Sequence, residues 1–127
     1  SQVDLFNSIS VLVGSKYESI DGNDFSQLLI NNKGKGRDEL IIEASTRTAF
    51  RKGDWVMIPP YKGPEVSKNV NIELGNSLNF MLYNLKEDPA QKNNLSVINE
   101  DKLKEMISSF IQIRGKNFSN IEDLILE

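Results

Sequence analysis

The sequence contains neither cysteine nor histidine. Without cysteine, the chain has no disulfide, no thiol nucleophile and no thiolate metal ligand. Without histidine, it lacks the commonest general base and the commonest metal ligand. No apolar run approaches the ~20 residues that a membrane-spanning helix needs. These absences argue against thiol chemistry, histidine-based catalysis and a membrane span within this chain.

The composition is otherwise that of a globular domain. The 127 residues are 39% hydrophobic and 26% charged, enough to bury one ordinary core. The net charge of −3 argues against a dedicated nucleic-acid binder, which would normally be basic. The chain opens at Ser1 without an initiator methionine, and we expect it to be a piece of a longer protein.

Hydrophobic periodicity and turn residues predict a mixed α and β chain. We expect helices at 1–13 and 99–114 and a brief one within 23–30, strands at 39–44, 48–51, 55–58 and 79–84, a polar loop at 61–75, and a short last element within 117–127. Gly53 suits a tight hairpin between the second and third strands.

Each of the two longer helices has one apolar stripe. In the C-terminal helix it predicts a core helix packed across the sheet, with a partner-binding helix as the alternative; its residues are Leu103, Met106, Ile107, Phe110 and Ile111. In the N-terminal helix it predicts packing either on this chain's own sheet or on an absent domain; its residues are Val3, Leu5, Phe6, Ile9, Leu12 and Val13.

Residues 88–95 read as a capped turn. Asp88 fits an N-cap, Pro89 the first helical position, and Gln91 the position that reaches back to the cap. We expect Asn93 or Asn94 to take a left-handed conformation and the leucine at 95 to pack underneath.

Two stretches carry a resemblance to a known family. The run 82–95 resembles the C-terminal signature of the sulfatases, with glutamine at 91 in place of the usual glutamate and Met81 where a glutamate commonly stands. The run 49–55 resembles a second sulfatase block, although a lysine that usually follows is missing. Asp21-Gly22 and Leu28-Leu29 resemble the linker that precedes these blocks. The matching residues, which we interpret as structural, are Arg51, Gly53, Asp54, Trp55, Leu82, Tyr83, Leu85, Asp88, Pro89, Asn94 and Leu95.

The resemblance implies an α+β fold. The C-terminal subdomain of sulfatases is a small antiparallel sheet of about four strands with a long helix packed on it. We therefore expect residues 1–36 to be a helical and linker segment from the end of the catalytic domain, which the N-terminal helix would belong to. Residues 37–127 would form the C-terminal α+β subdomain.

The resemblance also implies an arylsulfatase parent. Such enzymes use a formylglycine, made from the first residue of Cys/Ser-x-Pro-x-Arg, and a divalent cation, calcium or magnesium. No serine here begins that motif, and the acidic pairs lie on different predicted elements. We expect this chain to hold no cofactor and no catalytic residue, and a paired-carboxylate hydrolase is much less favoured. Its partner would be its own catalytic domain, with neither nucleic acid nor membrane bound.

The resemblance further implies that this chain scaffolds the catalytic domain and lines part of the substrate pocket. The candidates are Ser45, Thr46 and Arg47, before the hairpin, and the loop 61–68. Arg47 is favoured because a guanidinium suits a sulfated or carboxylated sugar, against the alternative of a solvated surface arginine. A non-catalytic binding module, or a phosphate or phosphonate ester hydrolase of the alkaline phosphatase superfamily, remains open. Because bacterial sulfatases are often exported, the resemblance implies a periplasmic or secreted enzyme.

Overall fold

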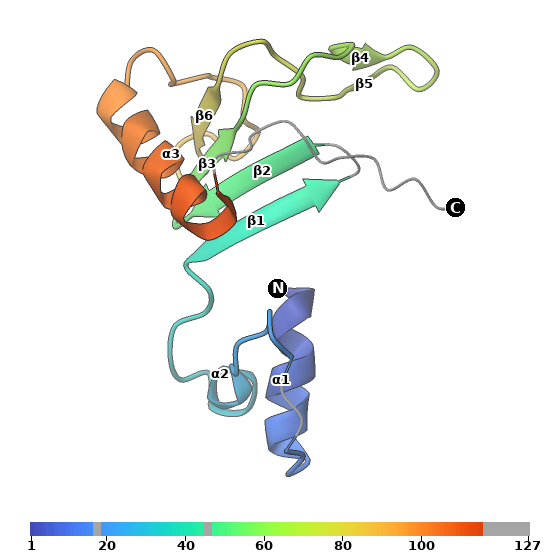
Figure 1. Ribbon diagram of the computed structural model, residues 1–127, viewed down its shortest axis with the longest axis vertical. Helices are drawn as coiled ribbons and strands as arrows, with labels where there is room; N and C mark the ends of the chain where they lie inside the picture. Colours follow the sequence, from blue (N-terminus) through green and yellow to red (C-terminus); the bar gives the residue numbers. More distant parts are fainter. Residues whose placement is uncertain (17–18, 45–46, 116–127) are drawn as a thin grey trace. The chain divides into compact units, whose positions relative to one another are not determined.

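The computed structural model describes residues 1–16, 19–44 and 47–115, and Figure 1 labels the helices and strands of each part. The chain divides into two units, Ser1–Asp38 and Glu39–Glu127. Ser45, Thr46 and the element expected within 117–127 lie outside the described residues. No helix in the described part of the chain is long and apolar enough to cross a bilayer.

The second unit is built on a four-stranded antiparallel sheet in the order β1-β2-β3-β6. The strands are β1 (Glu39–Ala44), β2 (Arg47–Lys52), β3 (Trp55–Ile58) and β6 (Met81–Asn84). Gly53 has a φ of 57°, the left-handed conformation that the tight β2–β3 turn requires. The predicted sheet is therefore confirmed.

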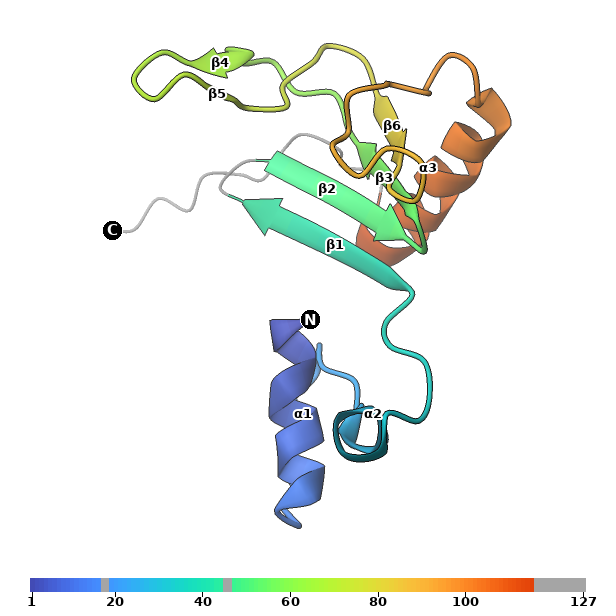
Figure 2. The same cartoon turned by 180° about the vertical axis from the view of Figure 1, so that it is seen from behind.

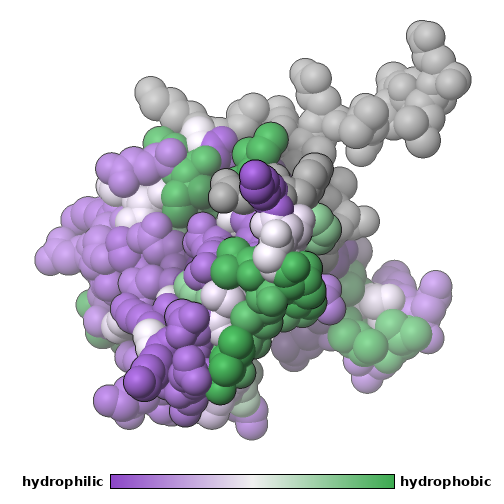
Figure 3. Space-filling view, turned by 90° about the horizontal axis from the view of Figure 1, so that it is seen from below, coloured by the Kyte–Doolittle hydropathy of each residue, from purple (hydrophilic) through white to green (hydrophobic). Residues whose placement is uncertain are grey.

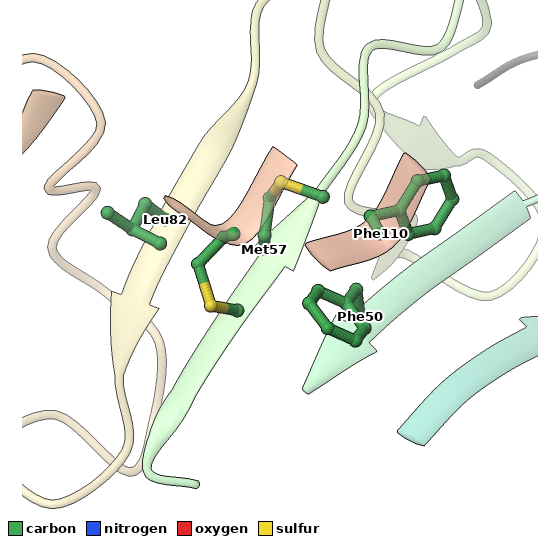
Figure 4. Packing of buried hydrophobic residues seen from close by; sticks show 5 residues of the cluster. Phe50, Met57, Leu82 and Phe110 are labelled. Atoms are coloured by element: carbon green, nitrogen blue, oxygen red, sulfur yellow. The ribbon is translucent and has the colours of Figure 1, made fainter. Parts of the chain in front are cut away.

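Helix α3 (Glu100–Arg114) packs on this sheet, as Figures 1 and 2 both show. The fully buried side chains between the two layers are Phe50, Met57, Leu82, Met106 and Phe110. Figure 4 shows Leu82, Met57 and Phe50 on neighbouring strands, with Phe110 of α3 close to Phe50. The rings of Phe50 and Phe110 meet edge to face, with centroids 5.9 Å apart. The interpretation of this helix as a core helix is confirmed.

The loop expected at 61–75 contains a hairpin that the sequence did not predict. Strands β4 (Val66–Ser67) and β5 (Ile72–Glu73) pair antiparallel. The hairpin extends away from α3 (Figure 2). Its strands are two residues long, too short to show a period in the sequence.

The turn at 88–95 forms by other contacts than those predicted. The Asp88 carboxylate accepts from the backbone N–H of Asn93 at 2.7 Å, whereas the N–H of Gln91 donates to the Asp88 carbonyl. The left-handed residue is Gln91, with a φ of 53°, and neither of the two asparagines that we expected. Leu95 does pack against the core. The capping-box prediction was wrong, because Asp88 closes a wider loop.

The first unit contains α1 (Gln2–Leu12) and α2 (Ser26–Asn31). The polar face of α1 is buried: Asp4, Asn7, Ser8 and Ser10 are all less than 8% exposed. These side chains hold the loop that leads to α2. The Asn7 amide donates to the carbonyl of Ser19 and accepts from its N–H, and the Ser8 hydroxyl accepts from the N–H of Phe25.

The Asp4 carboxylate is the most connected of these groups. It accepts from the Arg37 guanidinium, with 3.1 Å between Arg37 Nε and Asp4 Oδ2, and from the N–H of Asn23 at 2.9 Å. The hydrogen bond from Arg37 holds the pKa of Asp4 well below its usual range, against the opposing effect of burial. This carboxylate therefore stays charged inside the unit.

The apolar stripe of α1 is exposed. Its members are between 43% and 72% exposed; they are Val3, Leu5, Phe6, Ile9, Leu12 and Val13. On the side of the molecule drawn in Figure 3, hydrophobic residues form a continuous surface, coloured green. Within its own unit, α1 is thus turned with its apolar side outward.

Candidate functional site

Strand register places the start of β2 beside the end of β3. Phe50 lies opposite Met57 in this antiparallel pair, so Arg47, the first residue of β2, lies at the same end of the sheet as Ile58, the last residue of β3. The two prolines that follow β3 cannot donate to a ladder, and the chain leaves the sheet there. As a result, Tyr61 lies next to Arg47, with the guanidinium carbon 5.8 Å from the ring centroid.

A cavity of about 230 Å³ lies at this corner of the second unit. Its apolar lining comes from β1, β2 and β3, from the two prolines after β3 and from the loop after β5. These residues are Ile42, Ala49, Ile58, Pro59, Pro60 and Leu74. Its polar lining is Arg47, Thr48, Tyr61 and Asn76. Among the described residues, the lining therefore contains one cation and no acidic side chain.

Asn76 links the cavity to the loop after β3. Its side chain is 6% exposed, and its Nδ2 donates to the carbonyl of Pro64 at 2.5 Å. The N–H of Tyr61 donates to the carbonyl of Ser77 at 2.8 Å, which ties the same two segments together. The loop around residue 61 is thus fixed to the residues that follow β5.

Gly63 permits this close approach. A Cβ at this position would lie 2.9 Å from the Tyr61 ring and 3.0 Å from Nδ2 of Asn76. Such a distance is too short for any side chain, so a larger residue would have to displace one of the two lining groups. The glycine therefore helps to set the shape of the cavity.

Two buried side-chain atoms of the described residues have no hydrogen-bond partner: Nε of Arg47 and Oδ1 of Asn76. Both residues line this cavity. One atom is a donor and the other an acceptor. Because buried polar atoms nearly always have a partner, this pair marks the cavity as the candidate site.

The structure brings together part of the predicted set. Arg47 lines the cavity, and so does Tyr61 of the predicted loop 61–68. The two lysines of that loop, Lys62 and Lys68, do not line it. Sequence reasoning missed Asn76. An asparagine after a glycine reads as a turn, and nothing in its neighbourhood signals a buried side chain.

The motif residues lie away from the cavity and hold the fold. Arg51 donates from Nε to the Gly53 carbonyl at 3.0 Å, beside the turn as expected. The carbonyl of Asp54 accepts from the N–H of Leu85 at 2.7 Å, which joins the β2–β3 turn to the end of β6. The second of these contacts joins the block at 49–55 to the block at 82–95.

The described residues do not fit the two groups that the resemblance implies. No three acidic, histidine or cysteine side chains of the described part come together as metal ligands. The sequence itself has no cysteine and no Ser-x-Pro-x-Arg. No catalytic step is therefore assigned to these residues.

Comparison with known proteins gives one relation by sequence. The chain is 29% identical over 110 residues to an N-acetylgalactosamine-6-O-sulfatase of Bacteroides thetaiotaomicron, which covers 84% of this chain. No protein-family model matches. This chain is similar to sulfatases. It spans about a fifth of that relative, 22% of its length.

Solved structures share the fold. A Bacteroides thetaiotaomicron protein, studied for the metabolism of multiple glycosaminoglycans, is 24% identical and superposes with a TM-score of 0.81 over 91% of this chain and 25% of its own. Ps i-CgsB, solved with a neocarrahexaose, is 18% identical with a TM-score of 0.58 over 93% of this chain and 26% of its own. Both similarities confirm the predicted α+β arrangement of sheet and helix.

Proposed function

We propose that this chain is the C-terminal subdomain of a sulfatase that acts on a sulfated sugar. In this proposal the chain supports the catalytic domain and contacts the substrate away from the sulfate. The observation that carries the proposal is the cavity at Arg47. It is lined by Arg47 and Tyr61, which belong to the two segments that the sequence analysis selected, and the chain is similar to a sugar sulfatase. The nucleophile and the cation would belong to another part of the protein.

The charge of the cavity supports a sugar ligand. Of the lining residues that the structure describes, Arg47 alone is charged, and it lies over the Tyr61 ring. The guanidinium is planar and carries a fork of N–H donors that suits sugar oxygens, and the contact with the ring helps to orient it. The apolar remainder can cover a sugar face or a methyl group.

The exposed stripe of α1 supports the scaffolding role. A terminal helix with this much apolar surface outward normally has it covered by a partner. Since the chain spans about a fifth of its curated relative, the catalytic domain of the same protein is the natural partner. The polar face of α1 already makes hydrogen bonds to the loop at residues 19–25.

The test is activity of the protein encoded by the whole open reading frame. We expect it to hydrolyse sulfated monosaccharides and to contain Cys/Ser-x-Pro-x-Arg before Ser1. Arg47→Ala should raise KM about tenfold with a smaller change in kcat, because a contact away from the sulfate contributes to substrate and transition-state binding alike. Arg51→Ala is the matched control on the same strand. Turnover of phosphate esters but not sulfate esters would replace the sulfatase proposal.

A further inference from the structure

Arg37 ties the end of the first unit back to its first helix. The guanidinium donates from Nε to both carboxylate oxygens of Asp4, at 3.2 Å and 3.1 Å, and from Nη2 to the carbonyl of Asp21 at 2.9 Å. The side chain of Asp4 is 4% exposed and that of Arg37 is 22% exposed. A forked, charge-assisted contact with a buried carboxylate is stronger than an exposed ion pair, so Arg37 is held firmly on α1.

The segment before Arg37 would be a flexible tether without this contact. Helix α2 ends at Asn31, and the polar loop 33–36 that follows alternates lysine and glycine. A Cβ at Gly34, whose φ is 108°, would meet nothing within 4 Å, so the loop is not packed at that point. If it were not attached to α1, the stretch 32–38 would have an r.m.s. end-to-end distance of about 15 Å.

The contact shortens that tether to one residue. In the sequence, Asp38 alone lies between Arg37 and Glu39, where β1 begins. The Cα atoms of Arg37 and Glu39 can therefore be no more than about 7 Å apart. The chain leaves the first unit from a fixed point, and the loop 33–36 is closed off from the connection to the second unit.

We propose that Arg37 is a positioning residue for the sugar contact at the Arg47 cavity. In the proposed function a substrate is held at two places, its sulfate in the catalytic domain and its sugar at this cavity. The second contact forms more readily across a short connection, because the effective concentration of a tethered site falls with tether length. The inference rests on the proposed function, since it takes α1 to be anchored on the catalytic domain.

Two insertions of equal length distinguish a closed loop from an open tether. Gly-Ser-Gly-Ser placed between Gly34 and Lys35 lies inside the loop that Arg37 closes. The same insertion between Arg37 and Asp38 lies outside it. Both lengthen the chain between the units by the same amount, so they differ in effect only while Arg37 stays on α1. Neither insertion leaves a buried charge without its partner, which keeps both proteins foldable.

Distances between two spin labels report the freedom of the second unit. The chain has no cysteine, so labels can be attached through Gln27→Cys on α2 and Ser108→Cys on α3, two exposed positions. We expect the outside insertion to broaden the distance distribution by on the order of 10 Å and the inside insertion to leave it unchanged. Equal broadening by both insertions, or broadening by neither, would overturn the proposal.

Arg37→Met connects the result to the ion pair. Without the guanidinium the loop is open, so the two insertions should broaden the distribution alike. Lys35→Met is the matched control, because Lys35 pairs with Asp38 in the same segment through side chains that are 79% and 50% exposed. In this control the difference between the insertions should persist. A difference that also persists in Arg37→Met would overturn the role of Arg37.

The substrate readout uses the full-length protein and separates the two proposals. The outside insertion should raise KM for a sulfated sugar several-fold, toward the value of Arg47→Ala, with kcat nearly unchanged. A small aryl sulfate, which has no sugar to contact the cavity, should be hydrolysed as before. Equal KM values in the two insertion proteins would overturn the positioning role and leave the sulfatase in place. A clear difference in label distances without hydrolysis of any sulfate ester would support the Arg37 contact and overturn the sulfatase.

Discussion

The two units of this chain bury opposite kinds of side chain. The second unit has an ordinary apolar core between a sheet and α3. The first buries the carboxylate, amide and hydroxyls of α1 and leaves its apolar stripe outside. Both helices show a stripe at helical spacing, so periodicity alone identified the apolar face of each. It did not show which face would be buried within the unit.

The difference follows from the backbone hydrogen-bonding groups that each helix packs against. Helix α3 covers a sheet whose backbone groups are already paired, so only apolar surface is needed. Helix α1 meets a loop at residues 19–25 whose backbone N–H and C=O groups have no ladder. Polar side chains of α1 supply those partners.

The largest effect is expected from the apolar core. Phe110→Ala removes a fully buried ring that meets Phe50 and should lower the free energy of unfolding of the second unit by about 3–5 kcal/mol. Urea unfolding followed by the fluorescence of Trp55, the sole tryptophan, measures this unit. Ile113→Ala, on the same helix at a site 53% exposed, is the control and should change stability by less than about 0.5 kcal/mol.

The next effect is expected from the polar core. Asp4→Asn leaves the partly buried Arg37 guanidinium without its carboxylate and should destabilise the first unit by about 3 kcal/mol. Amide hydrogen exchange at Asn23 and Phe25 should become faster. The unfolding midpoint reported by Trp55 should stay where it is. A fall in that midpoint equal to the change in the first unit would show that the two units unfold together.

Acid should act on the same contact with a smaller effect. The pKa of Asp4 is lowered in the folded state, so its stabilising effect is complete above the ordinary aspartate value of about 3.9 and is lost as the pH falls below it. Between pH 5 and pH 2 we expect the exchange of the Asn23 amide to speed up relative to amides of the second unit. Asp4→Asn should remove this pH dependence. An equal acid response in the variant would assign it to other carboxylates.

The smallest effect is expected on the exposed stripe. Ile9 is half-exposed, so Ile9→Ser should change the melting temperature of this chain by only about a degree or two, the scale of a change within about 0.5 kcal/mol. In the full-length protein the same substitution should destabilise measurably, if the stripe faces the catalytic domain. A loss of several degrees in the chain alone would contradict the expectation that Ile9 faces the catalytic domain.

Much of the second unit could be predicted from residue types. Gly53 between two β-rich segments fixed a hairpin, and the stripe of α3 identified Phe110 as core. The β4–β5 hairpin could not be predicted, because two-residue strands carry no period. The turn after β6 failed for another reason: Gln91 adopts the left-handed conformation that asparagine or glycine usually takes.

The candidate site was predictable only in part. Arg47 and the loop at Tyr61 were chosen because the resemblance to sulfatases implies that loops of this subdomain contact the substrate. Asn76 was not, since its burial depends on a hydrogen bond to Pro64, twelve residues away in sequence. Contacts of this kind arise from loop packing and leave no local pattern. The predicted role of Arg47 itself stays a prediction.

The Asn94 side chain has a consequence for how this sheet can associate. By order, β1 and β6 are the outer strands. At β6, however, Oδ1 of Asn94 accepts from the N–H of Leu82, and the carbonyl of Leu82 accepts from the N–H of Leu95. A strand arriving from another molecule would find these groups already bonded. At Leu82, β6 is therefore closed to the edge-to-edge pairing of strands that begins aggregation.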